Sequence, residues 1–283
     1  MTVAKRSNYM LKKITILIIS CLFAMTTLSG CTTETSVKNM IEEALEKRYG
    51  EEFVCHDTWY DNDGAYYTTS YYGLCSPKDS PDILFEVLID DEGDFWRNAY
   101  VSTLASKIFC KEFDNKIGTN IGEHYTYCCN YYELDNDEVG QKIANDNFSL
   151  EYFMSDYIET RGSNKLGVYF TICVNITDET SIEYEDEYTG IINTMNYIHT
   201  IGQNYGMDLQ LNIELFFVET NIYQNCISYF KDNAKINSSF TDLIEKNAPY
   251  NEPQCMIKMN YKNGEFSITE DDYIEKRKEI NNV

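Results

Sequence analysis

Positive charge is scarce in this sequence. Its 283 residues include 46 Asp and Glu but only 23 Lys and Arg, which gives a formal net charge of −23 at pH 7. Proteins bind nucleic acid chiefly by neutralising phosphates with Lys and Arg, so this composition argues against a nucleic-acid partner. An anionic membrane surface would repel the folded part of the chain for the same reason. Any hold on a membrane must therefore come from another source.

The common catalytic and metal-binding motifs are also missing. The sequence contains no Gly-x-Ser-x-Gly elbow, no glycine-rich phosphate loop and no Cys-x-x-Cys pair. Acidic turns at 61–64 and 90–94 offer oxygen ligands for calcium, but neither completes the EF-hand pattern. Cys55, His56 and Asp57 would alternate between the two faces of a strand, so they cannot converge locally on one metal ion. We expect no cofactor and no metal site.

The first 31 residues have the pattern of an export signal. Every charge before Cys31 is positive, and the charge-free segment 14–28 is shorter than the ~20 apolar residues that a membrane span needs. The segment ends in Leu28-Ser29-Gly30-Cys31, which resembles the lipobox of bacterial lipoproteins. The resemblance implies that the Cys31 sulfur is alkylated by diacylglycerol and that the chain is cut after Gly30. The alternative is an ordinary cleaved signal peptide with a coincidental cysteine.

A lipid on Cys31 would determine where the protein resides. Two acyl chains suffice for stable anchoring where one does not, so the first expected partner is the membrane. We expect the protein at the extracellular face of the cell membrane of a Gram-positive envelope, held close to the bilayer by the short tether 31–35. A cell-wall polymer, a peptide or another envelope protein is the expected further partner.

The rest of the chain mixes helical and strand patterns, which predicts an α+β fold with a largely antiparallel sheet or sheets and packed helices. After a signal peptide at 1–30 and the lipidated tether, we predict an α+β lobe at 36–134, a polar linker or loop at 135–147, and a second α+β lobe at 148–283. Whether the two lobes are one domain or two stays open. Predicted helices cover 36–49, 94–113, 149–161, 180–205, 221–233 and the residues from 271 onward; predicted strands cover 53–60, 65–74, 83–89, 124–134, 166–174, 209–217, 255–261 and 266–268.

Three features of the first lobe resemble a group of small, uncharacterised Firmicute lipoproteins. They are residues 49–53 (Tyr-Gly-Glu-Glu-Phe), residues 85–87 (Phe-Glu-Val) and a helix that bears Tyr100. The resemblance is limited to the first part of the mature chain and implies no activity. A helix packed on a meander of strands is also similar to cystatin-like and PepSY-like modules, which is a likeness of fold alone.

Eight cysteines follow Cys31, and an even number outside the cytoplasm fits disulfide bonding. Eight cysteines allow 105 full pairings, so the sequence leaves the connectivity open. The alternative is that several are small buried hydrophobic residues, as free cysteines often are. Cys128 and Cys129 are adjacent in a predicted strand, so we expect them to face opposite ways.

Tyrosine is the one unusually frequent residue, with 24 Tyr beside only two Trp. Tyr66, Tyr67, Tyr71 and Tyr72 fall in the predicted strand 65–74 as two consecutive pairs, so both faces of that strand carry rings. One face would be core, and the other could stack on a sugar or grip a peptide, because tyrosine gives a large contact area at a small entropic cost. The alternative is that tyrosine replaces other core hydrophobes.

We therefore hypothesise a non-catalytic binding or interaction module of the cell envelope, with these four tyrosines as binding residues and no catalytic residues. The alternative is a secreted, lipid-anchored hydrolase with an unrecognised carboxylate or cysteine site, for which His56, His124 or His199 could act as a base. The acidic residues of the helix at 180–205 are expected to form a solvated face rather than a site: Glu183, Glu185, Asp186 and Glu187.

Overall fold

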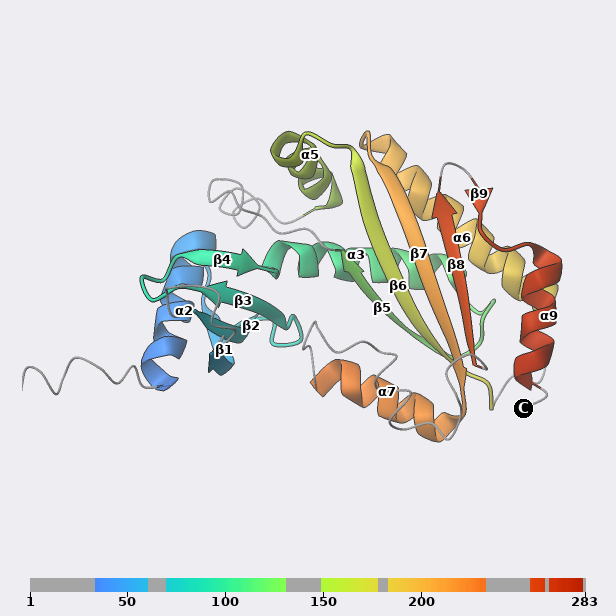
Figure 1. Ribbon diagram of the computed structural model, residues 1–283, viewed down its shortest axis with the longest axis horizontal. Coiled ribbons are helices and arrows are strands. Elements are labelled where there is room, and N and C mark those ends of the chain that lie inside the picture. The colour runs from blue at the N-terminus through green and yellow to red at the C-terminus, as the bar shows by residue number, and fades with distance from the viewer. Residues whose placement is uncertain are drawn as a thin grey trace, which may run out of the picture.

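The computed structural model describes residues 34–60, 70–130, 149–177, 183–232, 255–262 and 265–281, which form two β-sheets with helices packed against them (Figure 1). This arrangement confirms the predicted α+β class. The lipobox cysteine Cys31 and the predicted linker 135–147 lie outside the described residues.

The first sheet is an antiparallel meander in which each strand pairs with the next one along the chain. Helix α2 (Glu34–Tyr49) covers one face and buries Val37, Ile41 and Leu45 there. The helix ends at Tyr49 as predicted, and the next residue, Gly50, has φ 73° and donates its N–H to the Glu46 carbonyl at 2.8 Å. The four strands are β1 (Phe53–Tyr60), β2 (Tyr71–Pro77), β3 (Phe85–Ile89) and β4 (Phe95–Asn98).

The predicted helix start at Asp94 was wrong. Residues 95–98 form β4, which pairs with β3, and Trp96 lies on this edge strand with 38% of its surface exposed. Helix α3 begins only at Tyr100, whose N–H bonds the Asn98 side chain at 3.0 Å, and it runs as Tyr100–Ile117. Trp96 lies four residues before Tyr100, a spacing that suggested a helix from 94 onward, but the β3 ladder satisfies the backbone of 95–98.

The second sheet is largely antiparallel, but its two longest strands, β6 and β7, run parallel along their whole length. Parallel neighbours need a crossover connection, and helix α6 (Tyr184–Asn204) provides it. The five strands follow the order β5 (His124–Asn130), β6 (Lys165–Asn175), β7 (Asp208–Val218), β8 (Met256–Lys262) and β9 (Glu265–Phe266).

Helices cover both faces of the second sheet. The face that carries the alternating apolar residues of β7 packs against α3 and α6, and α9 (Glu270–Asn281) packs on α6. Helix α7 (Thr220–Asp232) lies against the opposite face with a small cluster of its own, made of Cys173, Phe216, Val218, Ile222, Tyr223 and Cys255.

Helix boundaries were predicted best where local capping determines them. Helix α5 (Leu150–Arg161) begins after Ser149, whose hydroxyl accepts the Tyr152 N–H, and it ends at Gly162 in the left-handed conformation. Within the described residues, α6 begins at Tyr184, with Glu183 as its N-cap and without a side-chain cap bond from that residue.

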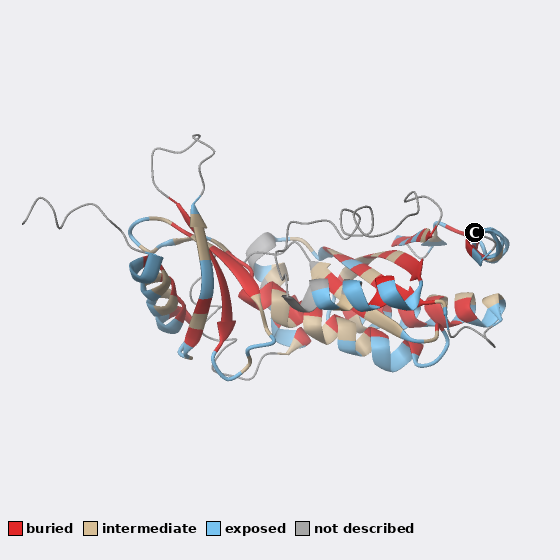
Figure 2. Ribbon diagram, turned by 90° about the horizontal axis from the view of Figure 1, so that it is seen from below, coloured by how far each residue is buried: buried red, intermediate tan, exposed pale blue. Residues whose placement is uncertain are grey.

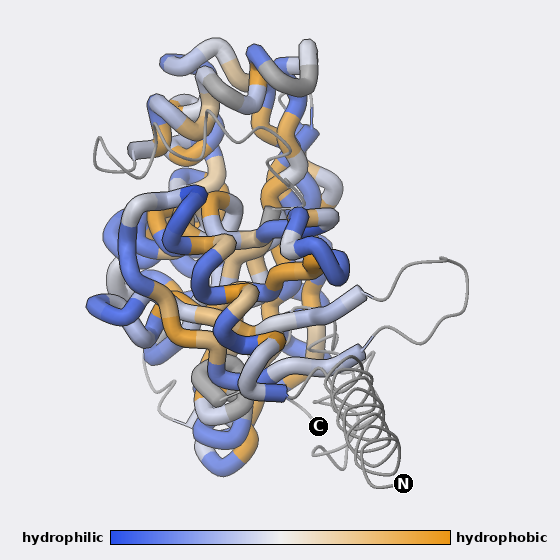
Figure 3. The backbone as a smooth tube through the Cα atoms, turned by 90° about the vertical axis from the view of Figure 1, so that its left-hand side faces the viewer, coloured by the Kyte–Doolittle hydropathy of each residue, from blue (hydrophilic) through white to orange (hydrophobic). Residues whose placement is uncertain are grey.

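One hydrophobic core joins the two sheets. A single cluster of buried residues runs from Val37 in α2 to Ile280 in α9, and α3 packs on both β3 and β5 to connect its halves. Figure 2 shows buried residues along the strands of both sheets, and Figure 3 shows hydrophobic residues interspersed with hydrophilic ones along the chain. Within the described residues, no helix is both long enough and apolar enough to span a bilayer.

The residues behind the Firmicute resemblance build part of this core. Contacting rings of Tyr49, Phe53, Phe85 and Tyr100 have centroids 4.8–5.9 Å apart. The Tyr100 hydroxyl donates to Glu51 at 2.7 Å. The pattern that carries the resemblance is therefore explained by packing between α2, the first sheet and α3.

Candidate functional site

Four aromatic side chains gather where β1 ends and β2 begins, and we call Trp59, Tyr60, Tyr71 and Tyr72 the hairpin aromatics. Trp59 is paired with Tyr72 in the strand register, and their rings are parallel to within 4° with centroids 5.4 Å apart. Tyr60 is paired with Tyr71 at a centroid distance of 5.3 Å and a tilt of 58°. The arrangement places a pair of rings on each face of the same sheet end.

A β-bulge in β1 decides which ring lies on which face. The register steps from Cys55 opposite Cys75 to Asp57 opposite Leu74, so His56 has no partner of its own in the ladder. Without this extra residue, Trp59 would share the face of Cys55, four positions earlier. The bulge turns Trp59 to the other face, where it meets Tyr72.

The face of Cys55 is the one that α2 covers. A Cβ atom added at Gly73 would lie 2.7 Å from Ile41 of α2 and 3.3 Å from the Cys55 sulfur. Tyr71 and Tyr60 point to this same face, Tyr71 being 5% exposed and Tyr60 53% exposed. Tyr71 is thus a core residue, whereas Tyr60 reaches solvent at the strand end.

The opposite face carries the Trp59–Tyr72 pair, and both of these side chains are half-buried. Two parallel rings at a sheet end can pack against the apolar face of a sugar or an extended chain, because aromatic rings supply a large and rigid contact area. Of the four predicted binding tyrosines, the structure places Tyr72 with this pair and Tyr71 in the core. Tyr66 and Tyr67 lie outside the described residues.

Trp59 and Tyr60 were missed in the sequence. They close the predicted strand 53–60, and pairing across a hairpin would have brought them opposite the tyrosines of the next strand. The sequence could not predict on which face each ring lies, because the bulge at His56 interrupts the regular alternation of side chains along the strand.

A serine–histidine contact lies near the bulge and bears on the hydrolase alternative. The His56 Nε2 atom is 2.9 Å from the Ser76 hydroxyl, which is the type of contact that activates a serine nucleophile. Ser76 is only 1% exposed, however, and a substrate cannot reach its hydroxyl. The contact connects β1 to β2 at the bulge.

His124 is held by hydrogen bonds at both ring nitrogens. Its Nε2 atom lies 3.4 Å from Asp114 of α3, and its Nδ1 atom lies 2.9 Å from the Gly122 carbonyl. Burial alone would lower the pKa of His124, but the bonds to Asp114 and Gly122 outweigh it and raise the pKa above 6.5. With both nitrogens engaged, this histidine ties α3 to β5 and has none left to deprotonate a nucleophile.

His199 is buried on α6, as expected for a structural histidine. Its Nδ1 atom is 3.2 Å from the Leu209 carbonyl, and its ring packs edge-on against Tyr261 at 4.7 Å between centroids. None of these contacts joins a histidine to a cysteine.

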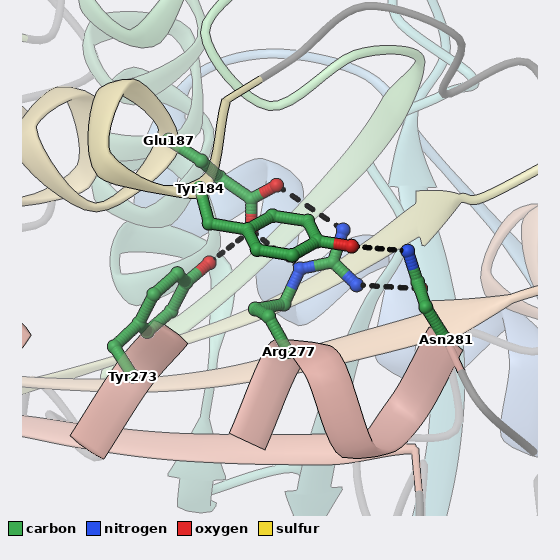
Figure 4. A network of polar contacts seen from close by, with 5 residues as sticks. All are labelled: Tyr184, Glu187, Tyr273, Arg277 and Asn281. Carbon is green, nitrogen blue, oxygen red and sulfur yellow. Dashed lines mark hydrogen bonds and ion pairs between the residues drawn. The ribbon is translucent and has the colours of Figure 1, made fainter. Parts of the chain in front are cut away.

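Glu187 is not part of a solvated face, and that expectation was wrong. Glu187 of α6 and Arg277 of α9 are both fully buried and form a two-point ion pair, with Nε–Oε1 at 2.8 Å and Nη2–Oε2 at 3.2 Å (Figure 4). The Tyr273 hydroxyl donates to the same carboxylate. The Arg277 guanidinium carbon also lies 3.8 Å from the Phe217 ring centroid, so a cation–π contact seats the arginine on β7.

The rim of this cluster is satisfied by a second set of bonds. Arg277 donates through Nη1 to Asn281 at 3.1 Å, and the Asn281 amide donates to the Tyr184 hydroxyl at 2.6 Å. We call Tyr184, Glu187, Tyr273, Arg277 and Asn281 the α6–α9 polar cluster. Because its groups bond one another and are shut off from solvent at the ion pair, the cluster fastens α9 to α6.

A shallow polar hollow of about 330 Å³ flanks α9 on its other side, lined by Lys258, Ser267, Ile268, Asp272, Glu275, Lys276 and Glu279.

Across the described ranges, no three His, Cys, Asp or Glu side chains gather in a way that would hold a metal ion. The Asp90 carboxylate instead accepts the N–H groups of Glu92 and Asp94 at 3.0 and 2.9 Å, and so closes its own turn.

Comparison with known proteins identifies a relative in structure alone. No family model matches the sequence, and no curated protein matches it either. Among solved structures, the chain is similar to a DUF5037 family protein from Ruminococcus gnavus ATCC 29149, with a TM-score of 0.59 and 13% sequence identity. The match covers 86% of this chain and 99% of that one. At this identity the likeness extends to the fold, which the two chains share almost end to end.

Proposed function

We propose that the protein is a lipid-anchored, extracellular binding protein of the cell envelope, which holds its ligand at the Trp59–Tyr72 pair without altering it chemically. The supporting observation is the parallel Trp59–Tyr72 pair, which is half-buried on the face of the first sheet opposite to α2. The anchor through Cys31 is supported by the lipobox resemblance of the sequence. The closed histidine contacts at Ser76 and Asp114 weigh against the hydrolase alternative.

The ligand that this surface suits best is a neutral polysaccharide. A net charge of −23 opposes the approach of anionic polymers, and the exposed Asp57 lies on the same side of the sheet as Trp59. A sugar ring offers a flat array of C–H bonds to an aromatic face, so stacking needs no charge. Cationic peptides and envelope proteins are the competing ligands, and the binding experiment includes a cationic peptide.

The test is a depletion assay with the full chain in detergent, using insoluble neutral polysaccharide, purified wall glycan and a cationic peptide resin in parallel. Trp59→Ser and Tyr72→Ser should each lower the association constant for polysaccharide by about 5- to 30-fold, since a stacked ring contributes ~1–2 kcal/mol. Tyr205→Ser is the control, because Tyr205 is an exposed ring at the end of α6, outside the hairpin aromatics.

Two outcomes would remove the proposed ligand. One is capture by the peptide resin alone, and the other is an equal loss of polysaccharide binding in the Tyr205→Ser control. The anchor is tested separately by feeding cells radiolabelled fatty acid. Label should enter the wild-type protein and be absent from Cys31→Ala; equal labelling of the two would refute the anchor.

A further inference from the structure

Two pairs of cysteines lie together in the described structure although they are far apart in the sequence. Cys55 of β1 and Cys75 of β2 are direct partners in the antiparallel register, and both are buried on the face that α2 covers. Residues directly opposite in such a pair have Cα atoms ~4.5 or ~5.5 Å apart, and disulfides span ~4.4–6.8 Å. Either value permits a bond between these two sulfurs.

The second pair connects α3 to β5. Helix α3 packs on β5; Cys128 of the strand belongs to the core cluster, and Cys110 of the helix packs against that cluster. Burial, followed by the interaction with the neighbouring Cys110 thiol, raises the pKa of the Cys128 thiol. Cys110 is only partly buried, so it is the member of the pair that an external reagent can approach.

Three other cysteines of the described structure, Cys129, Cys173 and Cys255, are placed differently from these four. Cys129 follows Cys128 in β5 and therefore points to the other face of the strand, where it is partly exposed. Cys173 and Cys255 share the α7 cluster, but Cys173 pairs with Phe216 of β7 while Cys255 precedes the partner strand on the far side of β7. Two strand spacings are ~9.5 Å, beyond the reach of a disulfide.

We propose that Cys55–Cys75 and Cys110–Cys128 are disulfide bonds in the exported protein, an inference that depends on the proposed export. Each bond forms by exchange with a disulfide oxidant of the envelope. One protein thiolate attacks an oxidant sulfur and expels one thiol; the second protein thiolate then attacks the mixed disulfide and expels the other. The protein pair loses two protons and two electrons, and the oxidant disulfide becomes two thiols.

The test is peptide mapping of the full chain isolated from its envelope, after free thiols are blocked with iodoacetamide under denaturing conditions. Trypsin cuts at Lys107 and Lys111 and so releases Cys110 on a short peptide, which should be recovered linked to the peptide that carries Cys128 and Cys129. No Lys or Arg lies between residues 49 and 77, so Cys55 and Cys75 stay on one tryptic peptide, expected two hydrogens lighter than its dithiol form.

Matched variants assign the bond of Cys110. Cys128→Ala should free Cys110 for alkylation, whereas Cys129→Ala should leave the link intact, because the two residues face opposite ways. The same split should appear in heat stability: Cys128→Ala should lower Tm by about 5–15 °C and Cys129→Ala much less.

Alkylation of all four cysteines, or links from them to other cysteines, would overturn the proposal. The fatty-acid experiment separates this failure from failure of the proposed export. If label enters at Cys31 while the four thiols are alkylated, only the disulfide inference is lost.

Discussion

The first sheet, β1 to β4, pairs only strands that follow one another in the chain, whereas the second sheet, β5 to β9, contains a parallel pair joined through α6. The first sheet carries exposed and half-buried rings at its hairpin end. The helices that cover the second sheet are joined by the Glu187–Arg277 ion pair, which is fully buried and connects residues 90 positions apart. The ligand surface that we propose therefore lies on the part of the fold built from local contacts.

The two halves differ in how these particular side chains are used. In the second half, buried carboxylate and guanidinium groups satisfy each other and hold a terminal helix in place, so they are closed to outside ligands. In the first half, the bulge at His56 turns an aromatic ring away from the helix-covered face. In our proposal, the second half is the scaffold and the first half carries the ligand surface.

Removal of Glu187 should have the largest effect on stability. Glu187→Ala leaves the buried Arg277 charge without its partner, which typically costs ~3–5 kcal/mol of unfolding free energy. Glu185→Ala, at an exposed position on the same helix, should change it by less than ~0.5 kcal/mol. Urea unfolding followed by circular dichroism measures both, and similar midpoints for the two variants would show that the cluster is dispensable.

Glycine-to-alanine substitutions should have effects of intermediate size on stability, and the effect should differ between the two sheets. A Cβ at Gly202 of α6 would lie 2.4 Å from the branched Cγ of Leu209, so Gly202→Ala should cost ~1–3 kcal/mol through overpacking of the second sheet. Gly73→Ala in the first sheet meets mainly the flexible tip of Ile41 and should be close to neutral, within ~1 kcal/mol. Thermal melts rank the two, and the reverse order would mean that the first sheet packs more tightly.

The smallest expected effect is the pH dependence at the junction of α3 and β5. Because the folded pKa of His124 is raised, its contribution to stability is full below pH ~6.5 and is lost as the pH rises through the folded value. The effect should be below ~1 kcal/mol, since Asp114 is half exposed and solvent screens it. His124→Gln should flatten the stability profile between pH 5 and ~8. An unchanged slope in this variant would assign the dependence to other groups.

Several elements could be predicted because their signals are local. Strand β1 has the predicted limits, and β7 shows the expected alternation of buried and half-buried residues. Ser149 and Gly162 bound α5 through contacts within one turn of the helix. Cys128 is buried and Cys129 is partly exposed, which agrees with the prediction that they face opposite ways, since side chains alternate along any strand.

Other features depended on partners that the local pattern does not contain. Helical spacing from Trp96 to Tyr100 suggested a helix, but pairing with β3 made residues 95–98 a strand. Glu187 stood in an acidic run that would be solvated on an isolated helix. Its burial depends on Arg277, an arginine 90 residues later. Arg277 lies on α9, a helix rich in charged residues, so its burial could not be predicted from the sequence either.

By itself, the sequence determined the α+β class, most helix and strand positions, and the excess of acid that argues against nucleic acid. Those properties follow from composition and from contacts a few residues apart. The tertiary structure alone decided that Trp59 stacks on Tyr72, that Arg277 is an interior residue and that Cys55 meets Cys75. A ladder register and a buried charge pair are set by which distant segments meet, and that choice is made by the packing of the whole chain.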